Sequence, residues 1–340
     1  MGISALILTG CGKPVKPVTT LSEAEKKFLQ LCRDDYQLTP LVRTAGKTLW
    51  IYLPSEDPII DLKASKKKRK TVVVDEVKET YRIQFLDGQF KDGVFHIQYD
   101  IALAKNYAKD YGYSTSFSDT YQSAQRNILT ALSRAYGDLE KSSEDNRYYR
   151  KRAGDIAIAD PIERAKHKRL MQSYAKQRPV AVPDIIILVV ADITKGIETR
   201  IIVAFDDLMR SRKDYYFQEE FTKRVIMDYP QGNPQIVGDT EGNHLDFYDM
   251  PWGEFLIKQI LYRINFRYTR SAFPPSDDTL RQLLEICYTT INAYHFEDFT
   301  AIELHDLRTD TRKTVPKAEL SAFKPKDTPS KGRLHTIRFF

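Results

Sequence analysis

The chain has 340 residues, of which 42% are hydrophobic and 29% are charged, and its formal net charge is +6. This balance can bury an ordinary core, and the length suggests about two domains. No apolar run approaches the roughly 18 residues that a membrane-spanning helix needs. The three cysteines and six histidines lack the C-x-x-C and H-E-x-x-H spacings of zinc sites, so no metal or other cofactor is expected.

The first residues form a short apolar run that ends in Leu8-Thr9-Gly10-Cys11. This motif resembles the lipobox of bacterial lipoproteins, where small residues let a signal peptidase cleave before a cysteine that carries a lipid. The resemblance implies that residues 1–10 are a signal-peptide remnant, that Cys11 is lipidated, and that residues 11–20 form an anchor and tether. It also implies attachment to a membrane of the bacterial cell envelope, at the periplasmic face or the outer membrane.

The alternative interpretation of this segment is a buried amino-terminal strand that turns on Gly10 and Gly12. A secretory signal normally has a positive stretch before its apolar run, and no Lys or Arg precedes this one. One acyl chain binds a membrane only marginally, so stable anchoring needs the further chains that the resemblance to lipoproteins implies.

Helix and strand patterns follow in the first half of the chain. Ser22 and Glu25 form a capping box at the start of a helix that ends before Pro40. Residues 49–53 predict a buried strand. Alternation of β-branched or aromatic residues with polar ones then predicts antiparallel strands over 71–77, 81–86 and 94–103.

A second helix is predicted from Ser118 or Asp119, followed by a hairpin over 184–190 and 201–205. The carboxy-terminal third repeats this order of strand, helix and hairpin. The repeat comprises a strand-like segment at 265–268, a helix opening at 274–277, a strand at 300–305 and a turn at 309–310.

The two units correspond at constant offsets, although one apolar stripe does not match the other residue for residue. Matched positions are Ser118-Asp119 with Ser276-Asp277, Tyr136 with Tyr294, and Asp192-Ile193 with Asp306-Leu307. Between the units, Trp252 and Phe255 begin the apolar face of another helix, which runs through Ile264.

These elements predict an α+β fold of mixed or mainly antiparallel sheet, with helices packed on one face and two related strand–helix–hairpin units. The expected organisation is a first domain, a second domain and a carboxy-terminal tail. Their ranges are 21–214, with a basic insertion at 139–182, then 215–324, and finally 325–340.

Two basic clusters are candidates for contact with anionic lipid or an envelope polymer, because lysine and arginine attract phosphate-bearing surfaces. The alternative is solvated loops whose charges prevent association of strand edges. Nucleic acid is not an expected partner, although Tyr148 and Tyr149 beside arginines would allow base stacking. The candidate contact residues are Lys66, Lys67, Lys68, Arg69, Lys70, Arg164, Lys168 and Arg169.

Two further sets of residues have alternative interpretations. In an oxidising compartment Cys32 and Cys287 would pair as a disulfide; otherwise both are buried thiols on apolar helix faces. Asp239, Glu241 and His244 carry groups that bind a hard cation or transfer protons. Their spacing matches no twelve-residue calcium loop, and the alternative is a polar turn.

The sequence offers no positive sign of nucleophilic catalysis. No Gly-x-Ser-x-Gly elbow occurs, and Ser65 with Lys68 lacks the partner motifs of the Ser-x-x-Lys enzymes. We therefore expect a lipid-anchored envelope protein with a non-enzymatic interaction or scaffold role, whose protein partner is not indicated. One alternative is an envelope hydrolase with a site assembled from distant residues. Another, if Cys11 carries no lipid, is a cytoplasmic protein that binds polyanions or nucleic acid.

Overall fold

The computed structural model describes residues 21–64, 79–105, 113–137, 182–212, 218–232, 237, 239–270 and 278–325. This part of the chain has an α+β fold, as predicted, with mixed sheets in which most neighbouring strands are antiparallel. The lipobox-like segment, both basic clusters and the strand predicted at 71–77 lie outside the described residues, as does most of the predicted tail.

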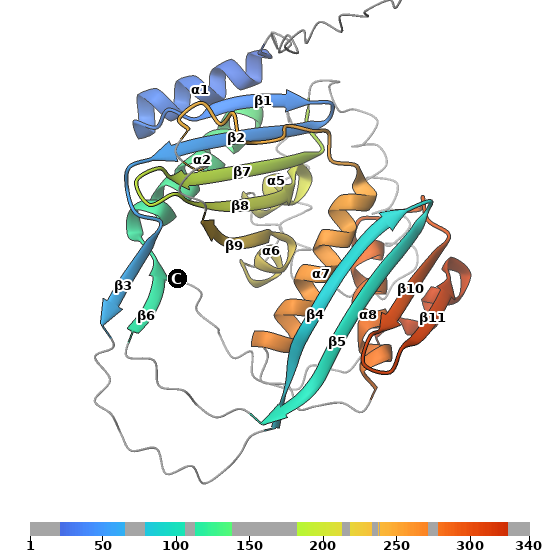
Figure 1. Cartoon of the computed structure of the whole chain (residues 1–340). Helices are drawn as coiled ribbons and strands as arrows, with labels where there is room; N and C mark the ends of the chain where they lie inside the picture. Colours follow the sequence, from blue (N-terminus) through green and yellow to red (C-terminus); the bar gives the residue numbers. More distant parts are fainter. Residues whose placement is uncertain are drawn as a thin grey trace, which may run out of the picture.

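The larger sheet has five strands in the order β1-β2-β7-β8-β9 (Figure 1). Its central strands β2 and β7 are parallel, whereas every other neighbouring pair is antiparallel. The strands are β1 (Leu41–Ala45), β2 (Thr48–Ser55), β7 (Ile185–Asp192), β8 (Ile197–Ala204) and β9 (Ile226–Gly232).

The four-stranded sheet has the order β11-β10-β5-β4 and repeats the arrangement of β1, β2, β7 and β8. In each sheet, two antiparallel hairpins are joined by parallel pairing of their inner strands. The strands are β4 (Glu79–Lys91), β5 (Val94–Lys105), β10 (Ala301–Asp306) and β11 (Thr311–Pro316). A separate antiparallel pair consists of β3 (Ile60–Ala64) and β6 (Tyr113–Phe117).

Main-chain hydrogen bonds show the correspondence of the two hairpin pairs. Ile193 N donates to Ser55 O at 3.0 Å after the end of β7, and Leu307 N donates to Tyr99 O at 2.9 Å after the end of β10. The preceding aspartate in each case, Asp192 or Asp306, accepts a main-chain hydrogen bond within the following turn. The predicted match between residues 192–193 and 306–307 is therefore confirmed.

The hairpins of the two sheets alternate along the chain. The two sheets are therefore not separated by the predicted domain boundary at 214/215. Strands β4 and β5 come from the predicted first domain but pair with β10 and β11 of the predicted second domain. The opening hairpin of the second unit is thus β4–β5, which the chain completes before it forms β7 and β8.

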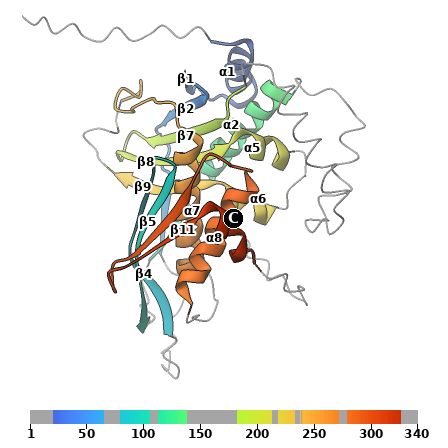
Figure 2. The same cartoon turned by 90° about the vertical axis from the view of Figure 1, so that its right-hand side faces the viewer.

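Helices cover both faces of the five-stranded sheet. Figure 2 shows α2 and α5 together on one side of it, and Figure 1 shows α7 between the two sheets. The predicted packing of helices on one face fits the four-stranded sheet, against which α7 packs. It does not fit the five-stranded sheet, which has helices on both faces. The helices are α1 (Glu23–Tyr36), α2 (Asp119–Gly137), α5 (Phe205–Arg212), α6 (Gln218–Arg224), α7 (Trp252–Arg270), α8 (Thr279–Ala293) and the 3-10 helix η1 (Lys317–Phe323).

Two helix predictions can be compared directly with the structure. The capping box of α1 is present, since Ser22 Oγ accepts from Glu25 N at 3.2 Å and Glu25 Oε2 accepts from Ser22 N at 2.6 Å. The strand predicted at 265–268 is wrong, because these residues form the end of α7. Tyr268 continues the buried stripe of this helix after Ile260 and Ile264, so its core face extends past the predicted end.

Candidate functional site

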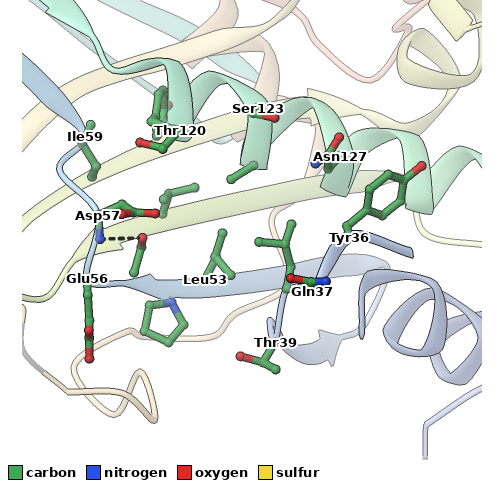
Figure 3. Close-up of a pocket in the computed structure, with 16 residues that line it drawn as sticks. Tyr36, Gln37, Thr39, Leu53, Glu56, Asp57, Ile59, Thr120, Ser123 and Asn127 are labelled. Carbon is green, nitrogen blue, oxygen red and sulfur yellow. Dashed lines mark hydrogen bonds between the residues drawn. The ribbon is translucent and has the colours of Figure 1, made fainter. Parts of the chain in front are cut away.

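A pocket of about 400 Å³ opens beside the five-stranded sheet, between the end of α1, the end of β2 and the first turns of α2 (Figure 3). It lies at the carboxyl ends of the parallel strands β2 and β7. In sheets with parallel strands, ligands commonly bind in the crevice outside these ends. The position and size of the pocket make it our candidate functional site.

Apolar side chains form the buried floor of the pocket. Leu53 and Val190 are register partners on β2 and β7, and both are buried, as is Ile59 after β2. Tyr121 of α2 is also buried: its ring stacks on Phe117 with centroids 4.9 Å apart, and its hydroxyl accepts from Thr199 Oγ1 at 3.0 Å. Burial raises the pKa of Tyr121, so this side chain serves as a neutral part of the floor.

The sharp end of α1 forms one wall. Gln37 adopts the left-handed conformation with φ of 56°, which stops the helix, and Leu38 N donates back to Cys32 O at 2.9 Å. This turn places Gln37, Leu38 and Thr39 along the pocket. The half-buried ring of Tyr36 lies beside them, and its hydroxyl accepts from Arg134 Nη1 at 3.5 Å.

Helix α2 forms the opposite wall. Ser118 caps this helix, because its hydroxyl accepts from Tyr121 N at 3.2 Å, so Ser118 is the capping residue of the two that the sequence left open. The cap fixes the start of the helix, and residues three and four positions apart share a helix face. Thr120, Ser123 and Asn127 follow this spacing and line the pocket.

Several polar groups at the pocket are available to a ligand. The side chains of Gln37, Thr39, Ser123 and Asn127 make no hydrogen bond within the described part of the chain, and the amide of Asn127 is half-buried. Amides and hydroxyls both donate and accept hydrogen bonds. Since an amide that is partly removed from water loses hydrogen-bonding partners, a ligand that supplies partners would stabilise it.

The charge at the pocket is negative. Among the described residues that line it are Glu56 and Asp57 but no Lys, Arg or His. Figure 3 shows the Asp57 side chain between β2 and α2, whereas the Glu56 side chain points away from the helix. Arg134, which reaches the Tyr36 hydroxyl, is paired with Asp35 and does not line the pocket.

Asp239, Glu241 and His244 lie in one turn of the structure, but their side chains have different hydrogen-bond partners. Asp239 accepts main-chain hydrogen bonds from Glu241 N at 2.8 Å and Asn243 N at 2.6 Å, which lower the pKa of its carboxyl. His244 Nε2 instead lies 3.0 Å from Glu198 Oε2 on β8. The stretch is a polar turn, and the described residues include no cluster of three or more His, Cys, Asp or Glu suited to a metal ion.

The disulfide that the sequence left open is not formed. Cys32 and Cys287 are free and buried in separate hydrophobic clusters, which lie on opposite faces of the five-stranded sheet. Burial raises the pKa of each thiol to about 12. The buried-thiol alternative describes both residues.

The remaining predicted site residues, namely Cys11 and the two basic clusters, lie outside the described residues. The pocket residues were not singled out from the sequence. On α2 they are polar positions that flank the apolar stripe, and a solvent-facing helix surface has the same pattern. None of the helices in the described ranges is long and apolar enough to cross a bilayer.

Comparison with family models, with curated proteins and with solved structures finds no match to this chain.

Proposed function

We propose that this chain is a lipid-anchored protein of the bacterial cell envelope that acts by binding, as an interaction or scaffold component, and not by catalysis. The observation that carries the proposal is the Leu8-Thr9-Gly10-Cys11 motif, which resembles a lipobox and stands a short tether before the capped helix α1. A lipid on Cys11 would hold the folded body close to the membrane surface.

The pocket supports a binding role. It has a buried apolar floor, and its rim carries hydroxyl and amide groups beside the carboxylates of Glu56 and Asp57. Hydroxyl and amide groups orient a ligand, whereas general acid–base catalysis needs a group whose proton is exchanged near the working pH.

The proposed anchor is tested by expressing residues 1–340 in a bacterium, beside Cys11→Ser and the matched control Lys13→Ser. We expect the wild type and the control to begin at Cys11, to carry added acyl mass and to sediment with membranes. The Cys11→Ser chain is expected in the soluble fraction, with residues 1–10 retained. A wild-type chain that keeps residues 1–10 and remains soluble would contradict the proposal.

The proposal also assigns Arg164, Lys168 and Arg169 to contact with anionic membrane lipid, since clustered basic residues near such a surface contribute about 1 kcal/mol each. The test compares the Cys11→Ser chain with the same chain carrying Glu at these three positions. We expect the triple change to weaken binding to phosphatidylglycerol vesicles. Neither chain is expected to bind phosphatidylcholine vesicles. Equal binding by both chains would remove this assignment.

A further inference from the structure

The pocket has the size of a small-molecule site. Its volume of about 400 Å³ falls within the roughly 300–1,000 Å³ that is usual for such sites. It is open on one side, because Gln37, Thr39, Asp57, Thr120 and Ser123 on its rim are exposed. A compact ligand, or the end of a longer one, can therefore enter without a change in the fold.

The distribution of apolar and polar groups restricts the chemistry of the ligand. The half-buried side chains of Tyr36, Leu38 and Pro54 offer apolar surface in the pocket, whereas the floor residues beneath are at most 3% exposed and offer almost none. The free amides of Gln37, at the end of α1, and Asn127, on α2, line the same pocket (Figure 3). The matching ligand has an apolar face and, around it, groups that both donate and accept hydrogen bonds.

The charge restricts the ligand further. Asp57 and Glu56 would repel an anion, and no cation among the described lining residues would compensate for that repulsion. Both carboxyl side chains are exposed and water screens them, so they disfavour an anion and favour a cation only weakly. A neutral ligand avoids the repulsion and uses the amides and hydroxyls that have no partner.

From these three observations we infer that the pocket binds a neutral carbohydrate, whose C–H ring face lies against Tyr36, Leu38 and Pro54 and whose hydroxyls bond to Asn127, Gln37 and the rim hydroxyls. Sugar hydroxyls donate and accept at once, as the free amides do. The inference rests on the proposed binding role and names its ligand class. Asn127 is the central residue, because it combines partial burial with an unused amide.

The test uses the full chain, in detergent where it is lipidated, with calorimetry and saturation-transfer NMR. The probes are N-acetylglucosamine and its dimer chitobiose as neutral sugars, glucosamine as a cation and glucuronate as an anion. We expect the neutral sugars to bind, glucosamine to bind with an affinity within a few-fold of theirs, and glucuronate to bind more weakly. Asn127→Ala should weaken binding roughly tenfold, the effect of losing about one to two hydrogen bonds, and Ser123→Trp should block the pocket.

Asn292→Ala is the matched control, because Asn292 is exposed on α8, away from the pocket. It should leave sugar affinity unchanged, and all variants should keep the wild-type circular dichroism spectrum. Binding of glucosamine more than about tenfold tighter than the neutral sugars, tighter binding of glucuronate, unchanged affinity in Asn127→Ala, or no binding of neutral sugars would overturn the inference. Membrane sedimentation of the same variants reports the anchor separately, so a failed sugar site and a failed anchor give different results.

Discussion

Asp249 Oδ1 accepts a hydrogen bond from the main-chain N–H of Lys47 at 2.9 Å, across 202 residues of sequence. Lys47 lies in the turn between β1 and β2, and Asp249 lies in the loop that leads into α7. The same oxygen also accepts from Thr48 Oγ1 at 3.1 Å. Gly46 in this turn has φ of 56°, and a Cβ there would stand 2.1 Å from the Asp249 carboxylate. The β1–β2 turn can therefore pack this closely on the loop before α7 only with glycine at position 46.

Asp249→Ala should lower the free energy of unfolding by about 1–3 kcal/mol, because it removes an acceptor shared by two donors. Urea denaturation followed by circular dichroism measures the change. Asp246→Ala in the same loop is the control, since Asp246 is exposed and its side chain makes no hydrogen bond with the described residues. Equal effects of the two substitutions would show that the hydrogen bonds accepted by Asp249 do not contribute to stability.

Asp207 is central to a buried polar contact between helices. Its carboxylate oxygens lie 3.2 Å from Arg224 Nη1 and 2.6 Å from the Tyr294 hydroxyl, and Asp207 is only 2% exposed. Asp207→Ala should destabilise the protein by about 3–5 kcal/mol, because it removes the carboxylate from a buried ion pair and from its hydrogen bond with Tyr294. Thermal unfolding should show a much smaller change for Glu23→Ala, which breaks the exposed pair with Lys26. Similar losses in the two variants would contradict this prediction.

Gly253 allows α7 to approach β4. A Cβ at this position would lie 2.0 Å from Cδ1 of the Phe90 ring. Gly253→Ala should therefore destabilise the fold by about 1–3 kcal/mol through overpacking, although alanine favours an exposed helix. Adding Phe90→Leu should recover part of the loss, as chemical denaturation of both single variants and the double variant can measure. Simple additivity of the two substitutions would argue against the close contact.

The two described cysteines should be unreactive in the folded protein. Burial raises the pKa of Cys32 and Cys287 to about 12, and the thiolate is the reactive form. In the Cys11→Ser chain, a thiol reagent at neutral pH should modify neither residue before denaturation and both afterwards. Two thiols released only by a reductant would instead indicate a disulfide.

Buried tyrosines make stability fall at high pH. Burial raises the pKa of Tyr52 and Tyr99 to about 12, above the ordinary value of 10.0. Between these values the unfolded chain loses phenol protons that the folded chain keeps, so the stabilisation is complete below pH 10 and declines from there towards pH 12. Urea midpoints measured across this interval should fall, and Tyr99→Phe should reduce the slope. A slope unchanged in Tyr99→Phe would disprove the assignment.

Much of the secondary structure follows from local patterns. The capping box at Ser22 and Glu25 predicts the start of α1. Of two Asp-Gly turn signals near the predicted strands, Asp92-Gly93 forms the hairpin of β4 and β5, whereas Asp87-Gly88 is wrong as a turn because β4 continues through it. These features are visible in the sequence because capping, turn formation and the side-chain periods of helix and strand depend on neighbouring residues. The end of α7 was not visible, because aromatic residues at 265–268 suit a strand until packing supplies a helix face.

The sequence alone determined the types of many elements, although not that of residues 265–268, as well as the likeness of the second hairpins of the two units and the lipobox-like motif at Cys11. Only the tertiary structure decided which hairpins pair, as Ser55 with Asp192 and Tyr99 with Asp306, since an apolar inner strand has no local preference for its partner. It also decided the pocket. The sequence around Asn127 and Asp57 predicts only solvent-exposed polar residues. The two residues line one pocket because α2 lies over the end of β2.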